Sequence, residues 1–138
     1  MPIVLALAAA LVAGTGPAAR AESPLGPHAL TNLSDALMRA YNDDDAAAMH
    51  GLLAPPLRAR YTPEAVRTAL TRCRVLTGDI FRLSTPSWGA RNYGFFAVYA
   101  ETAVFEMILE IGPDGRILHW VITDDVTADE QQCRLSRS

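Results

Sequence analysis

The chain contains no lysine, and all 12 of its basic residues are arginine, against 15 aspartate and glutamate residues. The formal net charge is −3 at pH 7. Nucleic acids and anionic membranes attract proteins through basic surface. The charge balance therefore argues against either as a partner. We interpret the absence of lysine as composition bias and not as a device for binding phosphate.

The sequence also lacks the motifs of common catalytic and cofactor sites. It has no phosphate loop, no GxGxxG, no zinc-ligand spacing and no pattern of a Ser/His/Asp or Cys/His triad. The histidines His28, His50 and His119 are widely separated. The three acids at 43–45 have no further ligand at a suitable spacing. We therefore expect no cofactor and no metal, and we expect residues 43–45 to cap a helix.

Long apolar runs are scarce, and the only one of note occupies residues 3–14. It is shorter than the roughly 20 apolar residues that span a bilayer. The small residues Ala19 and Ala21 flank Arg20 after it, as at a signal-peptide cleavage site. We predict that residues 1–21 are a signal peptide and that the protein is periplasmic or extracellular. An uncleaved anchor is the alternative.

Only two cysteines are present, Cys73 and Cys133, and both follow the predicted signal peptide. An even cysteine count in an oxidising compartment favours a disulfide. Two free thiols are the alternative, because Cys73 shares a helical face with Val66 and Leu70 and could simply be buried. Because no later apolar run reaches the length that spans a bilayer, we expect no transmembrane segment in the mature chain.

The mature chain is long enough for one domain. We assign residues 22–27 to a flexible leader, 28–125 to the domain and 126–138 to a polar tail. The tail is expected to be held down only if Cys133 is bridged.

Three helices are predicted in the first half of the domain. The first covers residues 28–41, with apolar residues at spacings of three and four. The second covers about 43–53 and ends at the two prolines that follow. The third has Thr62 as N-cap, Pro63 at its first position and Gly78 at its end.

Strands are predicted at 80–85, 93–100, 103–111 and 116–123, with a loop at 86–92. Apolar and polar residues alternate along 103–111, which is typical of a strand with one apolar face. Pro113, Asp114 and Gly115 fit a type I turn, in which Gly115 takes a positive φ. These features predict a curved antiparallel sheet behind the helices.

The hairpin register decides which side chains face the helices. A three-residue loop pairs Leu109 with His119 and places His119 and Val121 on the apolar face. A four-residue loop shifts the register by one and places Trp120 and Ile122 there instead.

This order of elements resembles the NTF2-like (SnoaL-like) superfamily, especially its small exported members. The resemblance covers about residues 28–124. It depends on the first helix ending at Tyr41, the acidic break and helix at 43–53, the helix from Thr62 to Gly78 and the hairpin FEMILEIGPDGRILHWVITDD. It implies an α+β fold in which three N-terminal helices pack in the concave face of a curved four-stranded antiparallel sheet. Such a cone-like fold leaves an apolar pocket at one end.

Members of this superfamily include isomerases, dehydratases and epoxide hydrolases as well as non-catalytic modules, so the fold does not choose among them. We favour a non-catalytic module that binds a small apolar ligand or a protein partner, because no convincing acid–base set is visible. The expected ligand pocket is lined by Leu37, Tyr41, Phe105, Met107, Leu109, His119 and Val121. The expected homodimer face consists of Glu106, Ile108, Trp120 and Ile122.

The alternative function is that of a small isomerase or lyase. It would use His119 or Asp79 as its acid or base, with a tyrosine such as Tyr99 as hydrogen-bond donor.

Overall fold

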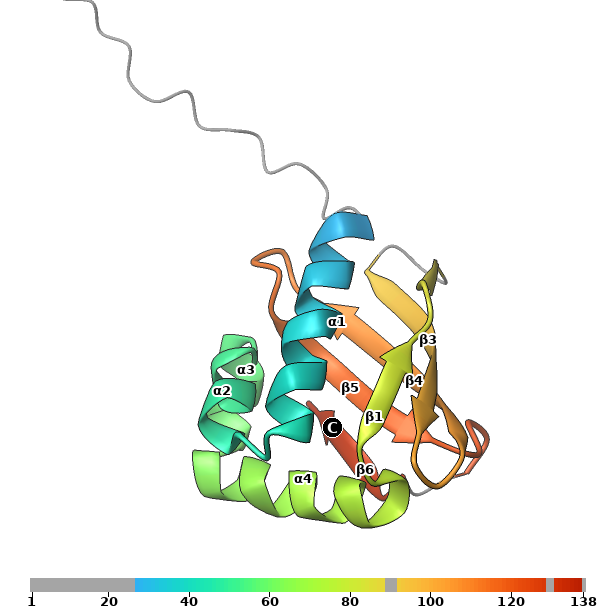
Figure 1. Ribbon diagram of the computed structural model, residues 1–138. Helices are drawn as coiled ribbons and strands as arrows, with labels where there is room; N and C mark the ends of the chain where they lie inside the picture. Colours follow the sequence, from blue (N-terminus) through green and yellow to red (C-terminus); the bar gives the residue numbers. More distant parts are fainter. Residues whose placement is uncertain (1–26, 89–91, 129–130, 138) are drawn as a thin grey trace, which may run out of the picture.

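The described chain places its helices first and its sheet second, in an α+β arrangement (Figure 1). The computed structural model describes residues 27–88, 92–128 and 131–137. The predicted signal peptide and the leader up to residue 26 lie outside the described residues. The helices are α1 (Pro27–Asn42), α2 (Ala46–Gly51), α3 (Pro55–Arg60) and α4 (Pro63–Thr77). The strands are β1 (Ile80–Leu83), β2 (Ser87–Trp88), β3 (Tyr93–Ala100), β4 (Val104–Ile111), β5 (Ile117–Thr123) and β6 (Cys133–Ser136).

The helix caps follow the sequence signals. The carboxylate of Asp45 accepts a hydrogen bond from the N–H of Ala48 at 3.0 Å and so caps α2. The hydroxyl of Thr62 accepts from the N–H of Ala65 at 3.1 Å and caps α4. Gly78 ends α4 with φ +67°. The predicted cap at 43–45 and the predicted limits of the helix after Thr62 are therefore confirmed.

Helix α3 is absent from the prediction, which ended the helical region at the two prolines Pro55 and Pro56. These prolines instead occupy the first turn of a short helix. Proline is tolerated there because its missing N–H would be unpaired in any case. The buried side chain of Leu57 anchors α3 in the core. The described chain therefore has four helices where three were expected.

The sheet is antiparallel, with five strands in the order β1-β3-β4-β5-β6, and β2 pairs with β3 beside β1. Two of its strands were not predicted. Strand β2 lies within the expected loop at 86–92. Strand β6 lies in the expected polar tail at 126–138, and pairs with β5 through Ile122–Cys133 and His119–Ser136.

The predicted three-residue turn is present, but the register that was derived from it is wrong. The N–H of Gly112 donates to the carbonyl of Arg116 at 2.8 Å, and Gly115 has φ +75°. Ile111 pairs with Ile117, and Glu110 then pairs with His119. Leu118 is thus an extra residue, a β-bulge, which turns every later side chain of β5 to the opposite face.

The bulge places Trp120 and Ile122 in the core, and His119 and Val121 on the face of the sheet that is turned away from the helices. Trp120 pairs with Leu109 and is 0 % exposed. Its ring meets the ring of Tyr41 edge to face, with 6.1 Å between the centroids. The prediction that Trp120 and Ile122 lie on an exposed face is therefore wrong.

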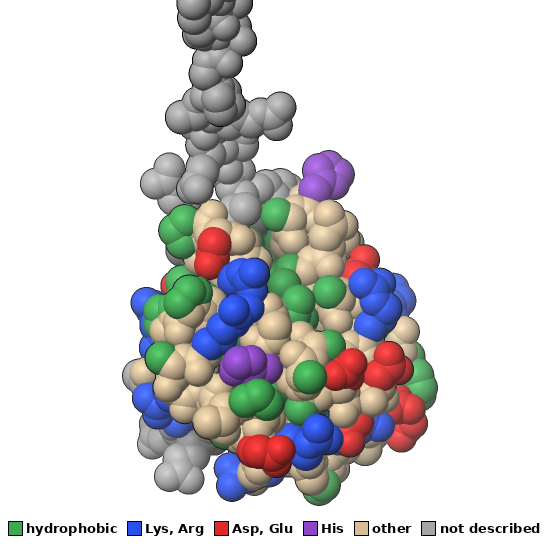
Figure 2. All heavy atoms as spheres, turned by 90° about the vertical axis from the view of Figure 1, so that its left-hand side faces the viewer, with side chains coloured by type: hydrophobic (Ala, Val, Ile, Leu, Met, Phe, Trp, Pro, Cys, Tyr) green, Lys and Arg blue, Asp and Glu red, His purple; other side chains and the backbone are tan. Residues whose placement is uncertain are grey.

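The helices cover one face of the sheet and enclose a single apolar core with it (Figure 1). On the side formed by α2 and α3, charged side chains of both signs are interspersed with small hydrophobic patches (Figure 2). Within the described residues, every helix is too short or too polar to cross a membrane.

Candidate functional site

The residues expected to line an apolar pocket separate into two groups. Five of them are buried in the core, with exposures of 0–4 %: Leu37, Tyr41, Phe105, Met107 and Leu109. None of the five lines either of the pockets described below. Trp120 packs beside them, at the place where the predicted register put His119. His119 and Val121 lie on the other face of the sheet.

Asp79 is held in an ion pair where α4 ends. The guanidinium of Arg74 donates to its carboxylate at 2.6 Å and also donates to the main-chain carbonyl of Tyr41 at 2.9 Å. The hydroxyl of Tyr41 shares a hydrogen bond of 2.6 Å with Thr77. Burial raises the pKa of Tyr41 to about 12. These contacts connect α1 and α4 to the residue that precedes β1, and so they stabilise the fold.

Tyr99 is remote from His119. It lies on β3 with the guanidinium of Arg82 stacked 4.1 Å from its ring centroid. His119 lies in the same cross-strand row as Glu110 and Tyr93. Tyr99 is six residues further along β3 than Tyr93, which corresponds to about 20 Å at roughly 3.3 Å per residue. The structure does not bring the expected acid–base residues together.

His119 instead belongs to a polar group on the helix-free face. Burial lowers its pKa, the nearby Glu110 opposes that shift, and Arg134 and Arg137 add to it. Glu110 accepts a hydrogen bond from Tyr93, which raises the pKa of the Tyr93 phenol. Arg137 lies 3.5 Å from the Glu110 carboxylate. None of these side chains lines a described pocket except that of Arg134.

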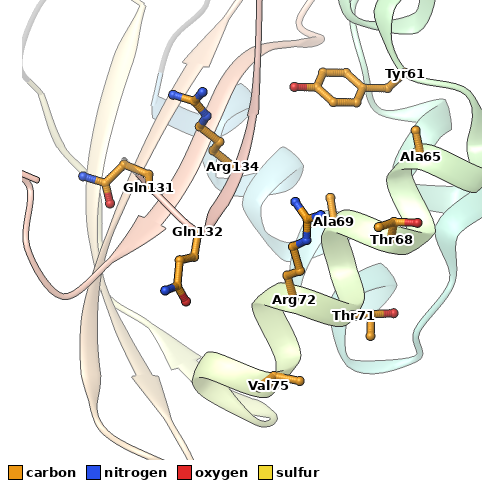
Figure 3. A pocket seen from close by; sticks show the side chains of 10 residues that line it. All are labelled: Tyr61, Ala65, Thr68, Ala69, Thr71, Arg72, Val75, Gln131, Gln132 and Arg134. Carbon is orange, nitrogen blue, oxygen red and sulfur yellow. The ribbon is translucent and has the colours of Figure 1, made fainter. Parts of the chain in front are cut away.

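An open groove of about 930 Å³ lies between α4 and β6 (Figure 3). We call it the α4–β6 groove. It is lined by Tyr61, Ala65, Thr68, Ala69, Thr71, Arg72, Val75, Gln131, Gln132 and Arg134. A smaller pocket of about 140 Å³ adjoins it near the end of β5 and shares Gln131 and Gln132 with it.

The disulfide between Cys73 and Cys133 attaches α4 to β6 beside this groove. Its S–S distance is 2.05 Å, and it joins Cα atoms 4.7 Å apart across 60 positions of sequence. The predicted pairing of the two cysteines is confirmed in this structure. At the other end, the hydroxyl of Tyr61 donates to the carbonyl of Ser136 and accepts from its N–H, both at 3.3 Å. The two walls are thus connected at two points.

One exposed face of α4 forms the helical wall. Ala65, Thr68, Ala69, Arg72 and Val75 recur at spacings of three and four, so they lie one above another on the helix. Most of these side chains are small, which leaves space between α4 and β6. This face gave no signal in the sequence, because the apolar periodicity of α4 marks only the stripe that enters the core.

Arginine is the only charged residue type among the described residues that line the groove. Arg72 extends into the groove from α4, whereas Arg134 lies at the rim on β6 with its guanidinium pointing away from α4 (Figure 3). Neither guanidinium has an ion-pair or hydrogen-bond partner in the described part of the chain. The lining contains no carboxylate. Two guanidinium groups, hydroxyls and amides beside small apolar side chains suit an anionic ligand that also presents amide or apolar groups.

Across residues 27–88, 92–128 and 131–137, no three histidine, cysteine or acidic side chains are close enough together to hold a metal ion. Comparisons with protein-family models, with curated proteins and with solved structures find no match for this chain.

Proposed function

We propose that this protein is an exported, non-catalytic binding module whose α4–β6 groove receives an anionic segment of a protein partner. The observation that carries the proposal is a groove with small side chains that is bordered by two arginines, Arg72 on its α4 wall and Arg134 at its β6 rim, neither of which has a partner in the described residues. Arginine binds carboxylates through a planar fork of donors. An acidic ligand would neutralise both charges, whereas an apolar ligand would leave them unused.

The separation of the expected acid–base residues supports the non-catalytic assignment. His119 and Tyr99 lie at opposite ends of the sheet, and Asp79 is engaged by Arg74. A general acid or base must come within hydrogen-bond reach of the group that it serves. No described pocket offers two such groups to one bound atom.

Export and the NTF2-like family remain part of the proposal. The small-residue site at 19–21 and the disulfide both suit an oxidising compartment outside the cytoplasm. The order of helices followed by an antiparallel sheet supports an NTF2-like origin. N-terminal sequencing of the protein from its exporting host tests the first point. Recovery of residues before Ala21 in the folded, exported protein would contradict cleavage.

A homodimer through the helix-free face of the sheet is a second proposal, now with a changed set of residues. Glu106 and Ile108 lie on this face, together with Phe95, which is 41 % exposed, and Val104, which is 59 % exposed. An apolar centre with a polar rim suits an interface. Sedimentation velocity should show dimers that Phe95→Asp dissociates. A monomer at high concentration would contradict this proposal.

The binding proposal is tested on an array of immobilised acidic, neutral and basic peptides. Wild-type protein should bind acidic peptides, and the double variant Arg72→Glu/Arg134→Glu should lose that binding. The control is Arg67→Glu, which makes the same type of substitution once, on an exposed residue of α4 outside the groove, and is compared with Arg72→Glu alone as well as with the double variant. Equal binding of basic and acidic peptides, or equal losses in the control and the groove variants, would overturn the proposal.

A further inference from the structure

Strand β6 is an edge strand, and one of its sides faces the α4–β6 groove. It pairs with β5 on one side only, at the end of the strand order. Edge strands present main-chain N–H and C=O groups that can pair with another extended chain. The direction in which these groups point can be deduced from one contact.

That contact is the pair of hydrogen bonds between Tyr61 and Ser136. Because the Tyr61 hydroxyl bonds both the N–H and the C=O of Ser136, these two groups point away from β5. In an antiparallel ladder the main-chain groups of alternate residues point to the same side. The N–H and C=O of Arg134 therefore also point away from β5, and no described residue bonds them outside the β5–β6 ladder.

We propose that an extended acidic segment of the partner binds in the α4–β6 groove as an added strand, paired with the main chain of β6 at Arg134. This inference deepens the proposed function and depends on it. In strand addition the main-chain hydrogen bonds supply affinity, and pockets for alternate side chains supply specificity.

The two walls of the groove give the added strand two different faces. Side chains on one face would lie beside the guanidinium of Arg134, where a carboxylate in the cross-strand position is favourable. Side chains on the other face would meet α4 at Ala65 and Ala69, where there is space for small or branched apolar groups. The positive charge of Arg72 on the helix adds a longer-range attraction for an acidic segment. The recognised segment therefore alternates acidic and apolar residues.

The groove has this shape before any ligand binds. The disulfide joins α4 to β6 near one end of the groove, and the Tyr61–Ser136 hydrogen bonds join the walls near the other. Such a preformed site lowers the ordering cost of association. Four residues of β6 span about 13 Å at roughly 3.3 Å per residue. We therefore expect a core motif of three to five residues, by the same strand geometry.

The test uses a fluorescein-labelled octapeptide of alternating glutamate and valine, and measures its binding to the mature protein by fluorescence anisotropy. Two further peptides carry N-methyl groups on all glutamates or on all valines. N-methylation removes the main-chain N–H donors and leaves the charges unchanged. Only one alternate set of residues in an added strand turns its N–H toward β6. One methylated peptide should therefore bind at least about tenfold more weakly than the other.

A second readout is hydrogen exchange at the Arg134 amide by NMR. Exchange at this amide should slow when the unmethylated peptide is bound. The variant Arg72→Glu should weaken binding of all three peptides, and the control Arg67→Glu should not.

The outcomes separate the two proposals. If the acidic peptide binds through the arginines but both methylated peptides bind equally and the Arg134 amide is unprotected, strand addition is overturned and the groove function stands. If no peptide binds, or Arg72→Glu changes nothing, both are overturned. Dimers in sedimentation velocity that the peptide dissociates would show that a second copy of the chain is the occupant, which also overturns the acidic partner.

Discussion

The centre of the sheet and its β6 edge differ in how they are filled. On the helix-covered face at the centre, Trp120, Tyr41 and Met107 are all 0 % exposed. At the edge, small residues on α4 leave a groove of about 930 Å³ beside Arg134. The large apolar side chains that the sequence predicted to line a ligand pocket instead fill the core. The segment at 126–138, which was expected to be a polar tail, borders this groove.

The largest expected effect is on the filled centre. Trp120→Ala should lower the free energy of unfolding by about 3–5 kcal/mol, because it removes a large side chain from a close-packed core. Urea denaturation measures this change. The control is Phe81→Ala, at a side chain that is 67 % exposed, which should change stability by less than about 0.5 kcal/mol. Similar small losses in both variants would indicate that Trp120 lies outside the core, as in the predicted register.

The disulfide connects the open edge to the filled centre. The double variant Cys73→Ser/Cys133→Ser should lose roughly 2–4 kcal/mol of stability, since the bridge restricts a long loop in the unfolded chain. The centre of the sheet should remain folded. Differential scanning calorimetry measures the lowered melting temperature, and wild-type protein with reductant is the matched comparison. A double variant that melts unchanged would contradict a stabilising bridge.

Tyr61→Phe removes the hydroxyl that bonds the main chain of Ser136 at the other end of the groove. We expect a loss of about 1 kcal/mol, the usual net value of such hydrogen bonds. Hydrogen exchange at the Ser136 amide should accelerate, while amides of β4 stay protected. Tyr99→Phe is the control, because the Tyr99 hydroxyl has no hydrogen bond within the described residues. An unchanged exchange rate at Ser136 would show that this end of β6 is held in place without the Tyr61 hydroxyl.

The smallest expected effect is on the helix-free face of the sheet, where His119 lies outside both the close-packed core and the α4–β6 groove. Burial lowers the pKa of His119 in the folded protein below the value of about 6.5 for an exposed histidine. The unfolded chain then binds more protons, so the contribution of His119 to stability is present above pH 6.5. It decreases as the pH falls from 6.5 through the lowered folded pKa.

His119→Gln should therefore lose less stability than the wild type between pH 7 and pH 5, as measured by urea denaturation at each pH. Carboxylates contribute the same pH dependence to both proteins and cancel in the difference. Parallel curves for the two proteins would show that His119 is as well solvated in the folded state as in the unfolded chain.

Short sequence patterns predicted correctly those elements that depend on residues close together in the chain. Thr62, Pro63 and Gly78 define α4 because capping and a positive φ depend on residues within one turn. Pro113 and Gly115 define the hairpin turn for the same reason, and alternation over 103–111 predicted β4. The polar residues at 126–138, in contrast, gave no signal for β6, because a four-residue edge strand gains its stability from β5 and from the disulfide.

The sequence by itself determined the α+β class, the helix caps, the hairpin turn and the cysteines available for a bridge. Only the tertiary structure decided which face of β5 enters the core. The main chain of Ile117 bonds Leu52 and Ala54, at 2.9 and 2.8 Å, beside the bulge at Leu118. These partners lie more than 60 positions away in the sequence. A bulge adds one residue without changing the apolar pattern around it, so periodicity cannot reveal it, whereas packing against the α2–α3 connection can.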